Sequence, residues 1–224
     1  MLGKFIAEII GTFVLVFVAA GSVMVNDISG GLVTLVGVAL STGISVMVMV
    51  YAIDNISGAH INPAVTFGFL LTRRLGWKEA LVYWAAQISG AVVAAGALRL
   101  ILGEVAQMGA NVPSVGVGQA LGMEILITFS LVFLIMAVTS NQDRLGGVSG
   151  VAIGAAVALG LLVGGPISGG SMNPARSLGP ALIGWIWVDH WVFWAGPLLG
   201  ASVGSLGYLY LDRISAAGVS EDSM

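Results

Sequence analysis

Two short stretches decide the fold, Ser57-Gly58-Ala59-His60-Ile61-Asn62-Pro63-Ala64 and Ser168-Gly169-Gly170-Ser171-Met172-Asn173-Pro174-Ala175. In each, Asn is a favourable N-cap, and Pro suits the first helical position because its missing N–H would be unpaired there anyway. Each copy therefore predicts a helix start, whose unsatisfied N–H groups and positive dipole end point beyond it. Two such starts, 111 residues apart in corresponding places of two half-chains, indicate a pathway at the midplane of a membrane.

The composition predicts an integral membrane protein. Hydrophobic residues make up 58% of the 224 residues and charged residues 8%, with a mean hydropathy of +1.02. Soluble domains carry about 25% charged residues. A net charge of −3 without a basic run argues against nucleic-acid binding. The lack of cysteine excludes disulfides, thiol catalysis and thiolate metal sites.

Apolar segments of about 20 residues, the length that a bilayer core requires, occur six times. Two further apolar segments, Pro63–Leu71 and Pro174–Trp185, are too short to cross and follow the second and fifth spans. The sequence therefore predicts an all-α membrane protein with six transmembrane helices plus two half-helices. The expected spans are Phe5–Val25, Leu32–Ile53, Glu79–Leu102, Gly116–Val138, Val148–Pro166 and His190–Leu211.

An internal repeat supports this layout. The segment Ala7–Phe13 matches Met123–Phe129, and each half contains an odd number of spans. The second half must therefore be inverted in the membrane, so that the half-helices meet N-terminus to N-terminus. We expect one channel domain over residues 1–214, with halves of about 1–105 and 115–214, and a polar, disordered tail over 215–224.

The distribution of Lys and Arg predicts the orientation. With both termini in the cytoplasm, only Arg99 lies toward the outside and Arg176 lies within the membrane, which satisfies the positive-inside rule. The cytoplasmic residues are then Lys4, Arg73, Arg74, Lys78, Arg144 and Arg213.

Four ionisable residues at membrane depth are candidates for function. Arg176, three positions after Asn173, predicts a fixed charge that repels cations and donates to neutral solutes, in preference to a side chain that snorkels to the surface. Glu8 and Glu124 occupy equivalent positions, so we expect them to accept bonds from the unwound backbone of their own half rather than to relay protons. A lone His60 is no metal site and predicts pore lining or backbone bracing.

The motif pair Ser57–Thr66 and Asn173–Ser177 closely resembles the aquaporin, or major intrinsic protein, family over Glu8–Arg213. The stretch Gly164–Pro180 is most similar to the nodulin-26-like branch and its bacterial relatives. The resemblance implies a passive channel that excludes ions, a homotetramer with one pore per protomer, and a cell-membrane location. It implies no enzyme activity, cofactor or metal.

The resemblance also places an outer selectivity constriction at Thr42, Leu161, Gly170 and Arg176. Water-selective relatives typically have an aromatic residue and His at the first two positions, and glycerol facilitators have two aromatic residues. The smaller set here predicts a wider filter that admits water and small neutral solutes, namely glycerol, urea or metalloid hydroxides such as arsenous, boric or silicic acid. The alternative, a strictly water-selective channel, is favoured by Ser177, Ala181, Phe193 and Trp194, which follow the water-channel pattern.

Two other classes fit less well. A secondary transporter with inverted repeats shares the broken helices but needs more ionisable residues inside the membrane for coupling. A membrane enzyme needs a nucleophile or a metal cluster, which the sequence lacks. The absence of cysteine also predicts insensitivity to mercurials, and a cysteine introduced at Gly170 is expected to face the pore.

Overall fold

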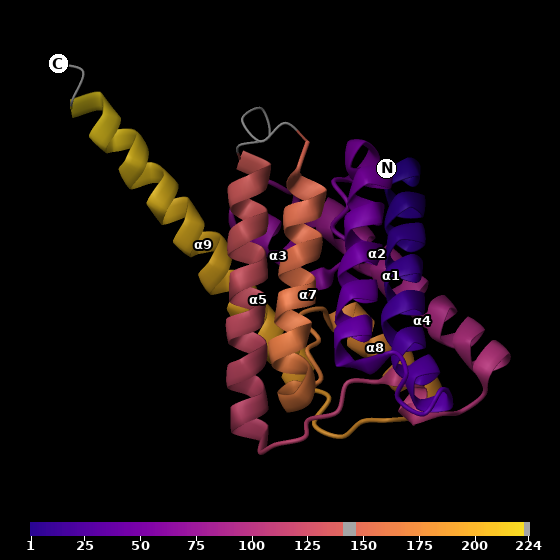
Figure 1. Cartoon of the computed structure of the whole chain (residues 1–224). Helices are drawn as coiled ribbons and strands as arrows, with labels where there is room; N and C mark the ends of the chain where they lie inside the picture. The colour runs from indigo at the N-terminus through magenta and orange to yellow at the C-terminus, as the bar shows by residue number, and fades with distance from the viewer. Residues whose placement is uncertain (141–146, 222–224) are drawn as a thin grey trace.

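The computed structural model describes the backbone of residues 1–140 and 147–221, and their side chains as far as residue 215. This part of the chain is helical and contains no strand. Six helices are long: α1 (Leu2–Ile28), α2 (Thr34–Ser57), α4 (Trp77–Leu102), α5 (Val117–Ser140), α7 (Ser149–Ser168) and α9 (Val192–Glu221). Two are short, α3 (Pro63–Leu71) and α8 (Pro174–Gly184), and a 3₁₀ turn, η1 (Ala106–Gly109), lies between the halves (Figure 1).

Length and composition make all six long helices candidates for membrane spans. Each has at least 20 residues, and a helix of 20 residues is about 30 Å long, which matches the hydrocarbon core. The half-helices, of 9 and 11 residues, are too short to cross. The expected six spans and two half-helices are confirmed.

The C-terminal end differs from the prediction. Helix α9 continues to Glu221, so the disorder expected from residue 215 is wrong for residues 215–221. Figure 1 shows this end of α9 leaving the helix bundle. Arg144, which we expected in the cytoplasm, lies outside the described residues, as do residues 222–224.

The helix contacts repeat from one half to the other. Helix α1 packs against α2 and α4, and α5 packs in the same way against α7 and α9. Helices α2 and α7 join the halves. Each half-helix packs against the last long helix of the other half, α8 on α4 and α3 on α9. This exchange of half-helices is the arrangement expected of an inverted repeat.

Small residues let the long helices cross at close range. Gly43 of α2 and Gly154 of α7 face one another, and a Cβ atom built on either one would collide with the carbonyl oxygen of the other. Gly90 meets the backbone of α1 at Ile9, and Gly200 meets the backbone of α5 at Ile125. Close packing of this kind is how membrane helices associate without a hydrophobic driving force between them.

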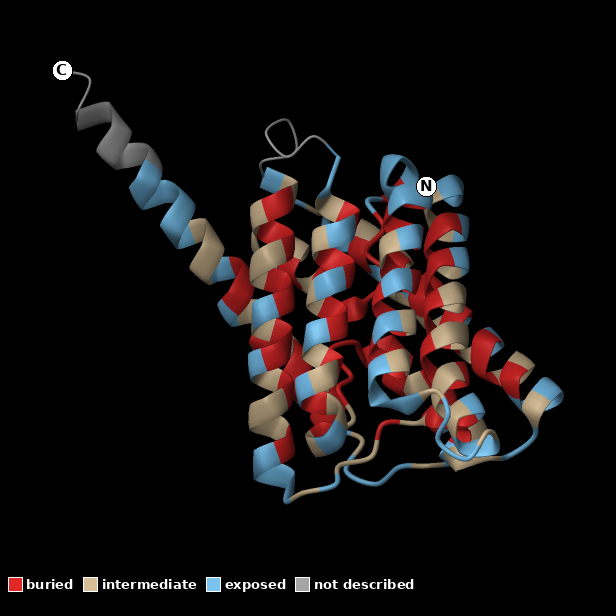
Figure 2. Ribbon diagram, viewed as in Figure 1, coloured by how far each residue is buried: buried red, intermediate tan, exposed pale blue. Residues whose placement is uncertain are grey.

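The outer surface of the bundle is apolar. Figure 2 shows buried residues on the inward faces of the helices and exposed ones on the outside. The exposed outward residues include Leu40, Leu126, Leu159 and Val163. This surface suits lipid and not water. The polar groups that could contact a solute therefore lie in the interior of the bundle.

Candidate functional site

The two half-helices begin at the paired motifs. Asn62 caps α3 by accepting a hydrogen bond through Oδ1 from the N–H of Ala64, at 2.8 Å. Asn173 caps α8 by accepting from the N–H groups of Ala175 and Arg176, at 3.0 and 3.3 Å. In both helices the first helical residue is the proline.

The same two asparagines also tie the halves together. Asn62 Nδ2 donates to the carbonyl oxygen of Met172 at 2.8 Å, and Asn173 Nδ2 donates to that of Ile61 at 2.9 Å. The two helix starts therefore meet, as the repeat predicts. Each side-chain amide carries two N–H donors, so one donor of each asparagine remains for another acceptor.

The unwound segments before the two helices share an unusual backbone. Ile61 and Met172 have φ of +41° and +52°, a region that side chains rarely adopt. This geometry directs their carbonyl groups to the opposite asparagine. Such backbone strain costs about 1–3 kcal/mol per residue and persists only where the surroundings hold it.

Glu8 holds the first unwound segment. Its Oε1 accepts from Ser57 Oγ and the N–H of His60, and its Oε2 accepts from the N–H of Ile61 and from Gln87 Nε2, at 2.7–2.9 Å. Glu8 is fully buried. Four donors converge on this carboxylate, which leaves it no contact with the pore.

Glu124 holds the second unwound segment in the same way. It accepts from Ser168 Oγ at 2.7 Å, and from the N–H groups of Ser171 and Met172 at 2.8 and 2.9 Å. The two carboxylates thus sit behind the segments, where a buried acceptor offsets the cost of leaving several backbone donors without water.

His60 packs in the first segment with its backbone N–H on Glu8. Its Nδ1 lies 3.0 Å from Thr66 Oγ1, and its ring packs against Phe69 and Tyr83, with centroids 4.5 and 5.0 Å away. His60 therefore both lines the pocket described next and braces its own segment.

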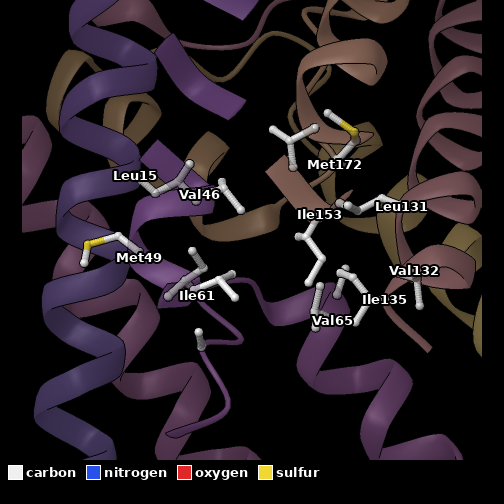
Figure 3. Packing of buried hydrophobic residues seen from close by; sticks show 14 of the residues in the cluster. Leu15, Val46, Met49, Ile61, Val65, Leu131, Val132, Ile135, Ile153 and Met172 are labelled. Atoms are coloured by element: carbon white, nitrogen blue, oxygen red, sulfur yellow. The ribbon is translucent and has the colours of Figure 1, made fainter. Parts of the chain in front are cut away.

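A pocket of about 60 Å³ runs between the half-helices. This volume exceeds the roughly 10–15 Å³ that a single water needs. Both unwound segments line it, together with apolar side chains. Figure 3 shows Val46 and Ile61 on one side of this region and Ile153 and Met172 on the other.

The pocket brings together most of the residues that the sequence selected. Asn62, Asn173 and His60 line it, and so do Thr42, Leu161, Gly170 and Arg176. Pro63, Ala64, Pro174 and Ala175 are buried but do not line it. Neither do Glu8 and Glu124.

A second pocket begins on the far side of the four filter candidates. Leu161 and Arg176 line both pockets, and Gly170 in the first is followed by Gly169 in the second. Residues that border two adjoining pockets form the partition between them. Leu161 and Arg176 therefore lie where the two pockets adjoin, at the level that the sequence predicts for the filter.

The four filter candidates differ in the hydrogen-bonding groups that they offer to a solute. Thr42 Oγ1 donates to the carbonyl of Val38 at 2.7 Å, so its hydroxyl oxygen can only accept from a solute. Arg176 contributes donors, and Leu161 contributes an apolar wall. Gly170 has φ of +61°, and a Cβ atom there would come within 3.1–3.2 Å of the backbone of Gly165 and Leu161. A side chain at 170 would thus press on the backbone of α7; since Gly170 itself lines the pocket, the expectation that a side chain there faces the pore stays a prediction.

Sequence reasoning missed the residue that contacts Arg176. Arg176 Nη1 donates to the carbonyl of Gly109 at 2.8 Å and to Asn111 Oδ1 at 2.6 Å. Asn111 lies in the connector between the halves, which has no apolar periodicity or motif. A buried, hydrogen-bonded Asn in such a segment leaves no local signal, because its partners are more than 55 residues away.

Comparisons with known proteins agree with this geometry. The sequence profile of the Major intrinsic protein family matches residues 1–208. Aquaporin NIP1-1 of Oryza sativa subsp. japonica is 47% identical over 206 residues, 92% of this chain and 72% of the relative. A probable NIP-type aquaporin of Nicotiana alata is 44% identical over 209 residues, 93% of this chain and 77% of the relative.

A solved structure agrees as well. The aquaglyceroporin from Plasmodium falciparum superposes with a TM-score of 0.80 at 27% sequence identity, covering 92% of this chain and 95% of that chain. The relatives and this neighbour confirm a channel for water and small neutral solutes, and not an enzyme. The chain belongs to the major intrinsic protein family, and its relatives are nodulin-26-like aquaporins.

Proposed function

We propose that this channel passes water and also larger uncharged solutes of the size of glycerol, urea or metalloid hydroxides. The observation that carries the proposal is that Thr42, Leu161 and Gly170, with small or aliphatic side chains, line the same pocket as Arg176. None of the first three is aromatic, so the side-chain volume that narrows a pore is missing. The neighbour's title as an aquaglyceroporin is consistent with this range.

A solute would meet complementary groups along the pathway. At the constriction, Arg176 donates to its oxygen while the hydroxyl oxygen of Thr42 accepts from its O–H or N–H. At the centre, the remaining N–H of Asn62 and of Asn173 donates again. The apolar side chains of the pocket, such as Val46 and Ile153, offer few further partners, so movement is in single file and follows the concentration gradient.

Ions would be rejected at two levels. The fixed charge of Arg176 repels cations at the constriction. The N-termini of α3 and α8 add two positive dipole ends at the centre. The carboxylates of Glu8 and Glu124 are held behind the unwound segments and do not line the pocket, so neither offers a passing cation a direct ligand.

We propose further that the protein is a homotetramer in the cell membrane, with its N- and C-termini in the cytoplasm. The tetramer rests on the family resemblance. The orientation rests on the positive-inside rule, with Lys4, Arg73, Arg74, Lys78 and Arg213 on the cytoplasmic side. Native mass spectrometry of the detergent-solubilised protein tests the assembly, and protease access to tagged termini in sealed vesicles tests the orientation.

Stopped-flow light scattering of vesicles containing the pure protein tests the solute range. We expect rapid flux of water and of at least one solute among glycerol, urea, boric acid and arsenous acid, independent of ion gradients. Fast water flux with exclusion of all four solutes would instead establish the strictly water-selective alternative. That alternative is favoured by Ser177, Ala181, Phe193 and Trp194, of which the first three are buried.

A further inference from the structure

The connector between the two halves is built into the constriction. After α4 ends, the chain turns inward through η1, in which Gln107 and Met108 have φ of +49° and +57°. Met108 and Asn111 are 2% and 4% exposed, so the connector is anchored in the protein at these positions. Gly109 lies directly on the backbone of Ala20, where a Cβ atom would collide.

Asn111 uses both ends of its side-chain amide at this point. Oδ1 accepts from Arg176 Nη1 at 2.6 Å and from Ser177 Oγ at 2.8 Å, and Nδ2 donates to the carbonyl of Gly169 at 2.7 Å. These partners belong to α8 and to the unwound segment before it. The side-chain amide of Asn111 therefore fixes the guanidinium of Arg176 relative to the segment that begins at Gly169.

We propose that Asn111 is a positioning residue that sets solute selectivity by holding Arg176, although it lies outside the four-residue constriction. The inference rests on the proposed function insofar as it takes the level of Arg176 to be the filter. Within the described residues, Arg176 Nε has no partner, so the position of the guanidinium depends on Nη1 and its two acceptors, Gly109 O and Asn111 Oδ1.

Truncating the Asn111 side chain removes one of the two acceptors of Arg176 Nη1 and leaves the carbonyl of Gly109 as the other. Hydrogen bonds to a charged group are about twice as strong as neutral ones, so losing one shifts the orientational equilibrium of the guanidinium by about tenfold or more. Gly169 loses its donor at the same time. Both changes alter the aperture and leave the charge in place.

Two variants of Asn111 separate an effect on the width of the filter from an effect on its charge. Asn111→Ala is expected to change the glycerol-to-water permeability ratio by about threefold or more with cation exclusion retained, because the charge of Arg176 persists. Asn111→Asp keeps the acceptor but places a negative charge beside the guanidinium. It is expected to leak cations or protons while water still passes. Ser114→Ala is the matched control, since Ser114 lies in the same connector with an exposed side chain.

A double-mutant cycle then tests whether Asn111 acts through Arg176. In an Arg176→Val background, Asn111→Ala is expected to leave the permeability ratio almost unchanged. All variants are measured by stopped-flow light scattering and by a pH-sensitive dye inside the same vesicles, with protein content determined for each.

Three results would overturn the inference. The first is an Asn111→Ala protein that lowers water and glycerol permeability equally, which indicates a merely structural role. The second is a change of ratio that is as large in the Arg176→Val background. The third is an Asn111→Asp protein that conducts water without added leak, which decides the matter if Asn111→Ala does not fold. If the wild type passes water alone, the proposed solute range fails, and the leak of Asn111→Asp still decides this inference.

Discussion

The unwound segments of the two halves share one backbone design but differ in their side chains. Both begin with a glycine in the left-handed region, at Gly58 and Gly169, and both are held by a buried glutamate. Position by position, 111 residues apart, His60 corresponds to Ser171 and Val65 to Arg176. The backbone of the two segments and its glutamate supports are therefore symmetric. The side chains at the proposed filter, above all Arg176, have no counterpart in the first half.

The surroundings of the two segments differ accordingly. The first is braced by its own half, through the contact of His60 with Thr66 and the bonds of Gln87 to Thr66 and Glu8. The second has a Ser171–Ser177 contact in the equivalent place and is braced by Asn111 of the connector. The first segment is thus held by residues of its own half, and the second, which leads into the proposed filter residue Arg176, is held by the connector as well.

The largest effect is expected from removing the glutamate supports. Glu8→Ala leaves four buried donors without an acceptor, and Glu124→Ala leaves three. Each unpaired group costs about 1–3 kcal/mol, so both variants should lose stability severely, with Glu8→Ala the worse of the two. The thermal unfolding midpoint in detergent and the yield of folded protein measure this.

Glu104→Ala is the control for both, because Glu104 is exposed and pairs only with Arg99 on the surface. Surface ion pairs contribute about 0–1 kcal/mol, so its midpoint should stay close to that of the wild type. Glu8→Ala protein as stable as the Glu104→Ala control would contradict the supporting role of the carboxylate.

The next largest effect is expected in charge exclusion. Arg176→Val converts the second motif to the residue that the first motif has, Val65, and removes the fixed charge at the constriction. We expect proton or cation leak with water flux retained, measured with a pH-sensitive dye in vesicles. Val65→Ala is the matched control and should not leak. An Arg176→Val channel without added leak would move the whole barrier to Asn62 and Asn173.

A smaller effect concerns reaction with mercurials. The wild type, which has no cysteine, should keep its water flux in mercuric chloride. Thr42→Cys should introduce a block that added thiol reverses, since Thr42 lines the pocket. Leu40→Cys, on the exposed outer face of the same helix, is the control and should stay insensitive. Micromolar block of the wild type, reversed by thiol, would show that another group in the pore binds mercury.

The architecture could be predicted from the sequence because it follows from local patterns. Span lengths follow from apolar runs, and helix starts follow from Asn and Pro. The paired positions of Glu8 and Glu124 follow from the repeat. These features depend on neighbouring residues or on internal symmetry, so no tertiary contact was needed to find them.

The errors have physical reasons as well. The role of Asn111 depends on contacts with residues 58–66 positions away, which no local pattern reveals. The polar composition after Leu211 suggested that the last span ends there, although α9 continues to Glu221.

The most direct test of the proposed filter is the ratio of glycerol to water permeability in vesicles. It is measured for the wild type and for the double variant Thr42→Phe/Leu161→His. If the constriction at Thr42, Leu161, Gly170 and Arg176 sets the solute range, the wild type passes both solutes. The double variant then keeps its water flux and loses glycerol flux by about tenfold or more, because an aromatic ring and an imidazole fill the aperture. A wild type that excludes glycerol, or a double variant that conducts it unchanged, would contradict the claim.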